Sequence, residues 1–203
     1  MNHHTHKTAI IISIFLFLFP VMGFAQIFKG GGHLGMLVSQ VDGDEHSGYK
    51  KLGLFVGGFV NFPFQKQPLA LQLELNYAQK GSKDNNIQYK ISTHQIEMPL
   101  FLMWNCWKEL HLDIGLSFDI LVSANEFLHK NKIEDMNRFY FCDLGGIVGI
   151  HYAIKDKFII GGRFNYSLSP IGINAISRKN RKIQTFMWSN ALIFFVAYQF
   201  GTT

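Results

Sequence analysis

The chain has 203 residues, of which 48% are hydrophobic and only 16% are charged, well below the roughly 25% of a typical soluble domain. Its formal net charge of +5 is mildly basic and by itself names no class of partner. After residue 25 the longest unbroken apolar run is 191–198, much shorter than the roughly 18 residues that a membrane-spanning helix needs. This composition excludes a bundle of membrane-spanning helices and is typical of a transmembrane β-barrel, in which apolar and polar residues alternate.

The first 25 residues have the pattern of a secretory signal peptide. Lys7 supplies the positive charge, residues 9–19 form a short apolar stretch, and Gly23-Phe24-Ala25 is a cleavage-type site followed by Gln26. The alternative is an uncleaved N-terminal membrane anchor, which the shortness of the apolar stretch and the cleavage-type site disfavour. We therefore expect a signal peptide over residues 1–25, export through it, and one domain over residues 26–203.

Eight extended segments follow in chain order. In the third segment, 69–80, the odd positions from Leu69 to Tyr77 are apolar and the even positions are small or polar, so a strand would have one apolar and one polar face. The fifth segment, 109–122, shows the same two-residue period from Leu110 to Ile120. The predicted strands are 29–40, 51–62, 69–80, 90–104, 109–122, 139–153, 158–168 and 185–200.

The connections between these segments alternate between short and long. Short turns are predicted at 63–68, 105–108 and 154–157, and longer polar loops at 41–50, 81–89, 123–138 and 169–184. This alternation, together with aromatic residues near the strand ends, predicts an all-β fold: an eight-stranded antiparallel up-and-down transmembrane β-barrel. Its short turns and both termini would face the periplasm, and its long loops would face outside.

Three segments resemble a known family. They are QLELNYAQKGS (72–82), EMPLFL (97–102) and GGRFNYSLSPI (161–171), and they are similar to the PorT-like outer-membrane β-barrels of Bacteroidetes-type bacteria. The resemblance covers about residues 28–200 and implies an eight-stranded barrel in the bacterial outer membrane. One namesake group of this family takes part in type IX secretion, whereas most members have no assigned activity.

The alternation also predicts which polar side chains point into the barrel. We expect Arg163 to be the one inward cation and to pair with Glu97 and also with Glu74. Such a network fits a lumen that is just wide enough for side chains to fill, and Phe55, Phe59, Phe101 and Phe195 would help to close it. The alternative is acid–base catalysis by paired carboxylates with a histidine. The inward residues are Glu74, Glu97, Asp113, Asp119, Asp143 and Arg163, with His33, His111 and His151.

Other kinds of site find little support in the sequence. There is no Gly-x-Ser-x-Gly elbow, phosphate loop or dinucleotide fingerprint, and the histidines and acids have no metal-ligand spacing, so we expect no cofactor, no metal and no enzyme activity. Cys106 and Cys142 are predicted at opposite ends of the barrel and should not form a disulfide.

The last long loop carries a basic run, Arg178, Lys179, Arg181 and Lys182. These side chains would contact lipid A phosphates or an acidic partner, or else form a solvated basic loop. The sequence thus indicates a structural or interaction protein with a filled lumen. Its expected partners are outer-membrane lipids, including lipopolysaccharide, and envelope proteins, with no nucleic acid. Two alternatives stay open: an accessory component of a secretion or envelope complex, and a membrane-embedded lipid-modifying enzyme, for which no outer-rim Ser or His with a supporting acid can be assembled.

Overall fold

A computed structural model describes residues 28–43, 49–64, 66–84, 89–128, 131–133, 139–155, 157–178 and 181–200. Ten strands are formed within these residues, and their bounds are β1 (Lys29–Asp42), β2 (Lys51–Pro63), β3 (Leu69–Asp84), β4 (Tyr89–Trp107), β5 (Leu110–Leu128), β6 (Asn131–Ile133), β7 (Cys142–Ile154), β8 (Phe158–Ser167), β9 (Gly172–Arg178) and β10 (Arg181–Phe200). Among the described residues, no helix is long and apolar enough to cross a membrane.

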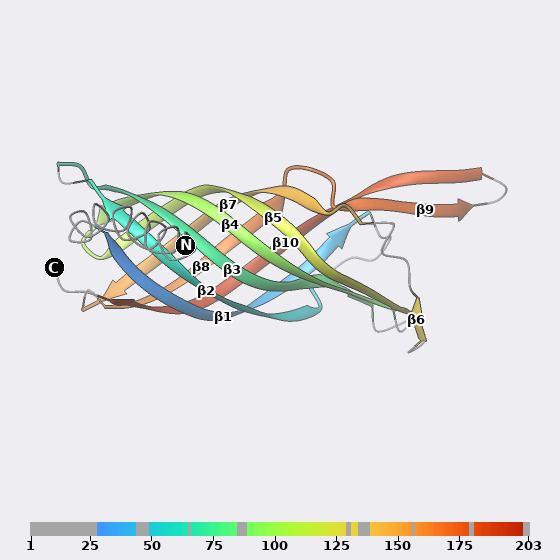
Figure 1. Ribbon diagram of the computed structural model, residues 1–203, viewed down its shortest axis with the longest axis horizontal. Coiled ribbons are helices and arrows are strands. Elements are labelled where there is room, and N and C mark those ends of the chain that lie inside the picture. Colours follow the sequence, from blue (N-terminus) through green and yellow to red (C-terminus); the bar gives the residue numbers. More distant parts are fainter. Residues whose placement is uncertain are drawn as a thin grey trace, which may run out of the picture.

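Eight of these strands form a closed barrel. Each pairs in antiparallel fashion with the next in the order β1-β2-β3-β4-β5-β7-β8-β10, and β10 pairs with β1 to close the ring (Figure 1). The closing pair runs from Gly30 opposite Phe200 to Asp42 opposite Trp188. The predicted fold class, an eight-stranded antiparallel up-and-down barrel, is confirmed.

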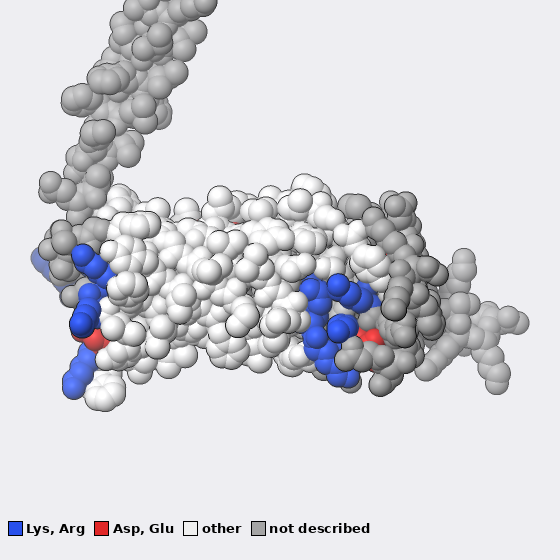
Figure 2. Space-filling view, turned by 90° about the horizontal axis from the view of Figure 1, so that it is seen from below, with Lys and Arg blue, Asp and Glu red and all other residues white. Residues whose placement is uncertain are grey.

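The two-residue period decides which side chains face outward. On β3, Leu73 and Leu75 are more than half exposed on the outer surface, whereas Glu74 and Asn76 between them are buried inside. The same alternation on the other strands gives the barrel an apolar outer belt, seen as the white band between the charged ends in Figure 2. Such a belt is the pattern of a barrel that crosses a bilayer.

The interior is filled by both apolar and polar side chains. Phe55, Phe59, Phe101 and Phe195 all point inward as predicted and are at most 6% exposed. Beside Phe59 and Phe195, the cavity lined in part by His33 and Arg163 measures about 10 Å³, room for about one water molecule. One apolar cluster of the interior is built around Phe55 and Phe195, and another around Phe101.

The predicted long loops were partly wrong, because several strands continue beyond the apolar belt. β3 extends to Asp84, β5 extends to Leu128 and pairs there with β6, and β9 pairs with the first half of β10 in a hairpin that projects from the barrel (Figure 1). Outside a bilayer the outer face of a strand no longer contacts lipid and need not be apolar, so the apolar period that marks a strand in the sequence is lost. β7 also begins at Cys142 rather than at residue 139, since Phe139 forms only an isolated bridge with Gly172.

The short turns lie together at one end and the longer connections at the other (Figure 1). Cys106 lies next to the turn between β4 and β5, whereas Cys142 begins β7 at the opposite end, and both cysteines are free. Ten residues of β5 separate Leu110 from Ile120, the partner of Cys142, which is about 33 Å of strand. The expected signal peptide, residues 1–25, lies outside the described residues.

Candidate functional site

The first charged group in the lumen is the ion pair of Arg163 and Glu74. Both guanidinium Nη atoms donate to the Glu74 carboxylate, at 2.8 Å and 2.9 Å, in the two-pronged geometry that suits arginine. The guanidinium lies between the rings of Phe101 and Phe195, with its carbon 4.4 Å and 4.5 Å from their centroids. β8 and β3 are not neighbouring strands, so this contact crosses the lumen.

Glu74 receives two further hydrogen bonds from its own strand. Gln72 Nε2 donates to it at 2.6 Å and Asn76 Nδ2 at 2.9 Å. Asn76 in turn bonds His33, whose ring stacks on Phe55 with centroids 4.9 Å apart. Four donors converge on one buried carboxylate, which is the arrangement that a buried charge requires.

A second charged group lies on the long-loop side of the first. Lys80 Nζ lies 2.5 Å from Glu97 Oε1 and 3.4 Å from Asp119 Oδ2, and Lys80 is only 2% exposed. Glu97, Asp119 and Asp143 occupy directly opposed positions on β4, β5 and β7, so three acids share one side of the wall. Ser117 bonds Asp119, and Ser167 Oγ donates to Asp143 at 2.9 Å.

A third group lies near the short-turn end. His151 Nδ1 lies 2.9 Å from Asp113 Oδ2, and the His151 ring stacks on the half-buried His111 ring at 4.6 Å. Arg163 Nε lies 3.9 Å from the same Asp113 oxygen. Gly149 lies between Asp113 and Arg163 in the register, and a Cβ there would come within 2.8 Å of Arg163 Cγ, so glycine leaves room for the arginine stem.

The structure corrects two expectations about these charges. Arg163 pairs with Glu74 and not with Glu97, which pairs instead with Lys80. Arg163 is therefore not the one inward cation, and Lys80 was missed. The parity of β3 could have found it, because Lys80 is in phase with Glu74 and Asn76.

These contacts can neutralise charge and close the lumen. A His–Asp pair such as His151–Asp113 is a part of many acid–base sites, but here it is packed among stacked rings and the Arg163 side chain. Among the described residues, no group of His, Cys, Asp or Glu could hold a metal ion.

A closed lumen predicts the electrical behaviour of the barrel. The wild-type protein in planar bilayers should show no stable conductance of porin size, because Phe101, Phe195 and Arg163 block the interior. Replacing Phe101 and Phe195 together by alanine should open small, unstable conductance steps. Large regular steps from the wild-type protein would contradict a filled interior.

Three residues of the predicted basic run lie in the strands of the projecting hairpin. Arg178 ends β9 and is paired across the hairpin with Arg181, which begins β10 and is followed by Lys182. Their side chains, and Lys179 entirely, lie outside the described residues. At the same end of the barrel, Lys83 on β3 stands directly opposite Lys90 on β4.

Comparisons with known proteins agree with this architecture. A family model described as outer membrane protein β-barrel domain matches residues 23–172. No curated protein matches the chain. Ail, the attachment invasion locus protein of Yersinia pestis, solved in complex with the heparin analogue sucrose octasulfate, is similar at a TM-score of 0.53 and 10% identity, over 85% of this chain and 99% of that one. Neisserial surface protein A is similar at a TM-score of 0.52 and 12% identity, over 85% and 97%. At these identities the likeness concerns the fold alone.

Proposed function

The chain belongs to the outer membrane protein β-barrel domain family, and we propose that it is a structural and interaction protein of the bacterial outer membrane whose long-loop end binds the phosphates of lipopolysaccharide. The observation that carries this proposal is the gathering of lysines at that end. With the lumen filled, the surfaces left for partners are the outer belt and the two ends.

The lysine group, Lys50, Lys51, Lys83 and Lys90, lies where β2, β3 and β4 leave the apolar belt. Lys83 and Lys90 are exposed and directly opposed, an arrangement that is destabilising for like charges in an antiparallel pair. The ammonium of Lys51 is within electrostatic reach of both. An anion placed among these ammonium groups would relieve their repulsion, and a phosphate is the anion that lysine commonly binds. Figure 2 shows basic side chains beyond the apolar belt at this end, and a further group at the opposite end.

Two further observations support a polyanionic partner. Arg178, Arg181 and Lys182 lie in the strands of the hairpin at the same end, and the proposal includes them together with Lys179 of the same basic run. The barrel of Ail, which shares the fold, was solved with the highly sulfated sucrose octasulfate. The finer assignment to the PorT-like barrels, which rests on segments 72–82, 97–102 and 161–171, is part of the proposal. Neither a catalytic activity nor a role in secretion belongs to it.

The lysine group gives the first test. Lys83→Glu with Lys90→Glu should weaken the binding of lipid A to the detergent-folded barrel by about tenfold or more, because each charge-assisted hydrogen bond contributes about 1.5–3 kcal/mol. Binding of the wild type should fall as salt is raised. The measurement is thermophoresis with lipid A and with its dephosphorylated form.

The matched control is Lys66→Glu with Lys108→Glu in the short turns at the opposite end, which should leave lipid A binding unchanged. Equal binding of phosphorylated and dephosphorylated lipid A by the wild type would contradict the proposal.

Export is the second test. The protein expressed in a Gram-negative host should lose residues 1–25 and begin at Gln26, because Gly23-Phe24-Ala25 is a cleavage-type site. Mass spectrometry of the N-terminus and fractionation of the membranes measure this directly. An intact Met1 in inner-membrane fractions would overturn it, and replacing Ala25 by a bulky residue should block the cleavage.

A further inference from the structure

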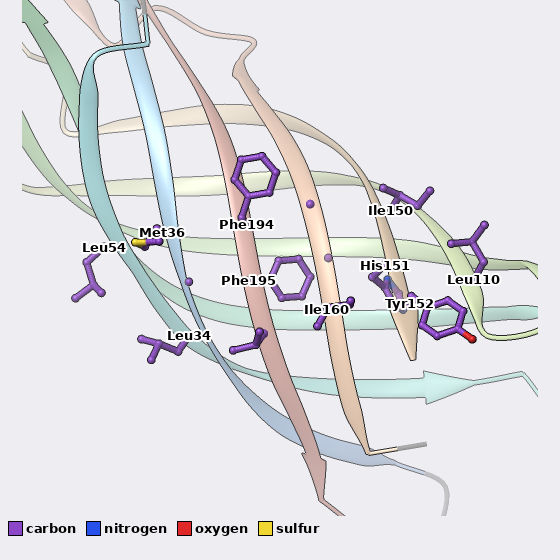
Figure 3. A pocket seen from close by; sticks show the side chains of 14 residues that line it. Leu34, Met36, Leu54, Leu110, Ile150, His151, Tyr152, Ile160, Phe194 and Phe195 are labelled. Atoms are coloured by element: carbon purple, nitrogen blue, oxygen red, sulfur yellow. The ribbon is translucent and has the colours of Figure 1, made fainter. Parts of the chain in front are cut away.

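The outer belt of the barrel is interrupted by a groove of about 810 Å³ that reaches from β2 across β1, β10, β8 and β7 to the start of β5 (Figure 3). Its walls are almost entirely apolar, with Phe194 and Val196 on β10, Ile160 on β8 and Ile150 on β7. Tyr152 lies at the end of the groove nearer the short turns. A groove of this size falls in the range of small-molecule sites, which are mostly apolar with a few polar groups.

Gly162 forms the floor of the groove. It points outward between Phe194 of β10 and Ile150 of β7, which are its partners in the register. A Cβ at this position would make only ordinary van der Waals contacts, the nearest with the Phe194 ring at 3.7 Å, so a side chain can be added there without a clash at its Cβ. A second hollow of about 350 Å³ shares Gly162, Phe194 and Ile150, so the depression continues along the strands on both sides of the glycine.

We propose that this groove binds one acyl chain of an anionic phospholipid, with the lipid phosphate at the Tyr152 end beside Lys155 and Lys157. The inference rests on the outer-membrane location and is independent of lipopolysaccharide binding at the opposite end. A groove within the apolar belt is surrounded by hydrocarbon, and hydrocarbon is what its walls complement. Lys155 and Lys157 are exposed in the turn between β7 and β8, where they offer positive charge to a phosphate.

The dimensions agree with one lipid leaflet. Gly162 lies five residues after Lys157, which precedes β8, so about 16 Å of strand joins them, or about 12 Å along the bilayer normal at a strand tilt of about 40°. Half of a hydrocarbon core about 30 Å thick is about 15 Å. Tyr152 is 46% exposed, and tyrosine is enriched at the level of the headgroups. A lipid with its phosphate at the lysines would therefore place its chain over Gly162.

The test fills the groove and counts the bound lipid. The full-length mature barrel, extracted in mild detergent, is titrated with phosphatidylglycerol or phosphatidylcholine, and bound lipid is counted by native mass spectrometry. The wild type should retain one phospholipid and prefer phosphatidylglycerol. Gly162→Leu should lower retention at least tenfold, because its side chain occupies the floor. Lys155→Gln with Lys157→Gln should keep retention but lose the preference.

The matched control is Gly146→Leu, another outward glycine of the belt, where a Cβ would meet only ordinary contacts with Leu168 at 3.4–3.5 Å. It should bind lipid as the wild type does. If Gly162→Leu does not fold, as judged by its heat-dependent shift in gels, the smaller Gly162→Val gives the same comparison. Equal retention by the filled variant, no retained lipid on the wild type, or a dimer that Gly162→Leu disrupts would each overturn the proposal. Lipid A binding by all these variants should stay unchanged, so its loss would report on the function proposed above and not on the groove.

Discussion

Arg163→Met should lower the free energy of unfolding of the detergent-folded barrel by about 3–5 kcal/mol, the usual cost of removing one partner of a buried ion pair. The variant leaves Glu74 charged and buried, with Gln72 and Asn76 as its remaining donors. It also removes the cation from between Phe101 and Phe195. Urea titration followed by tryptophan fluorescence measures the loss.

The second substitution identifies the partner. Adding Glu74→Gln to Arg163→Met should restore most of the lost stability, because no uncompensated charge then remains in the lumen. Adding Glu97→Gln to Arg163→Met should restore little, since Glu97 contacts Lys80 and not Arg163. Rescue by Glu97→Gln and not by Glu74→Gln would show that Glu74 is not the partner of Arg163. A negligible effect of Arg163→Met itself would mean that the pair does not stabilise the barrel.

The side chains that face the lumen could be predicted wherever a bilayer enforces the two-residue period. Glu74 and Leu75 are neighbours in sequence, yet one is 3% and the other 59% exposed, because lipid selects one face and the lumen the other. Phe55, Phe101 and Arg163 were placed inward by the same parity.

Pairing across the lumen could not be predicted in this way. Parity gives a side chain its face but not its height, and height depends on the register between strands. Glu74 and Glu97 both face inward, but the register pairs Asn76 with Glu97, so the two acids lie at different levels of the barrel. Arg163 on β8 therefore reaches Glu74, whereas Lys80 on β3 reaches Glu97.

The parts of the strands that extend beyond the apolar belt could not be predicted from the sequence for a different reason. Beyond the belt the outer face of a strand no longer contacts lipid, and residues 169–184, which include β9 and the start of β10, are rich in basic and other polar residues, so they read as a loop in the sequence. The pairing of β4 with β5 also shifts register between His94 and Gln95, which changes the phase along β5. The groove at Gly162 could not be predicted either. The sequence shows a glycine in a strand, but it does not show which residues of the adjacent strands lie beside it.

Lys80→Met should cost a similar amount, about 3–5 kcal/mol, for the opposite reason. It removes the cation that contacts Glu97 and Asp119, in a wall where Glu97, Asp119 and Asp143 are directly opposed. Like charges at directly opposed positions destabilise a sheet. The matched control is Lys83→Met three residues along β3, which is exposed and should change stability by no more than about 0.5 kcal/mol.

Single substitutions of the acids should separate the two charged groups. Glu74→Gln leaves Arg163 with no equivalent partner and should destabilise strongly, since Asp113 is 3.9 Å from its Nε. Glu97→Gln leaves Lys80 with Asp119 at 3.4 Å and removes one of three crowded acids, so its cost should be clearly smaller. It should also recover part of the loss in Lys80→Met. The same urea titrations measure all four variants, and a larger cost for Glu97→Gln than for Glu74→Gln would contradict an excess of negative charge around Lys80.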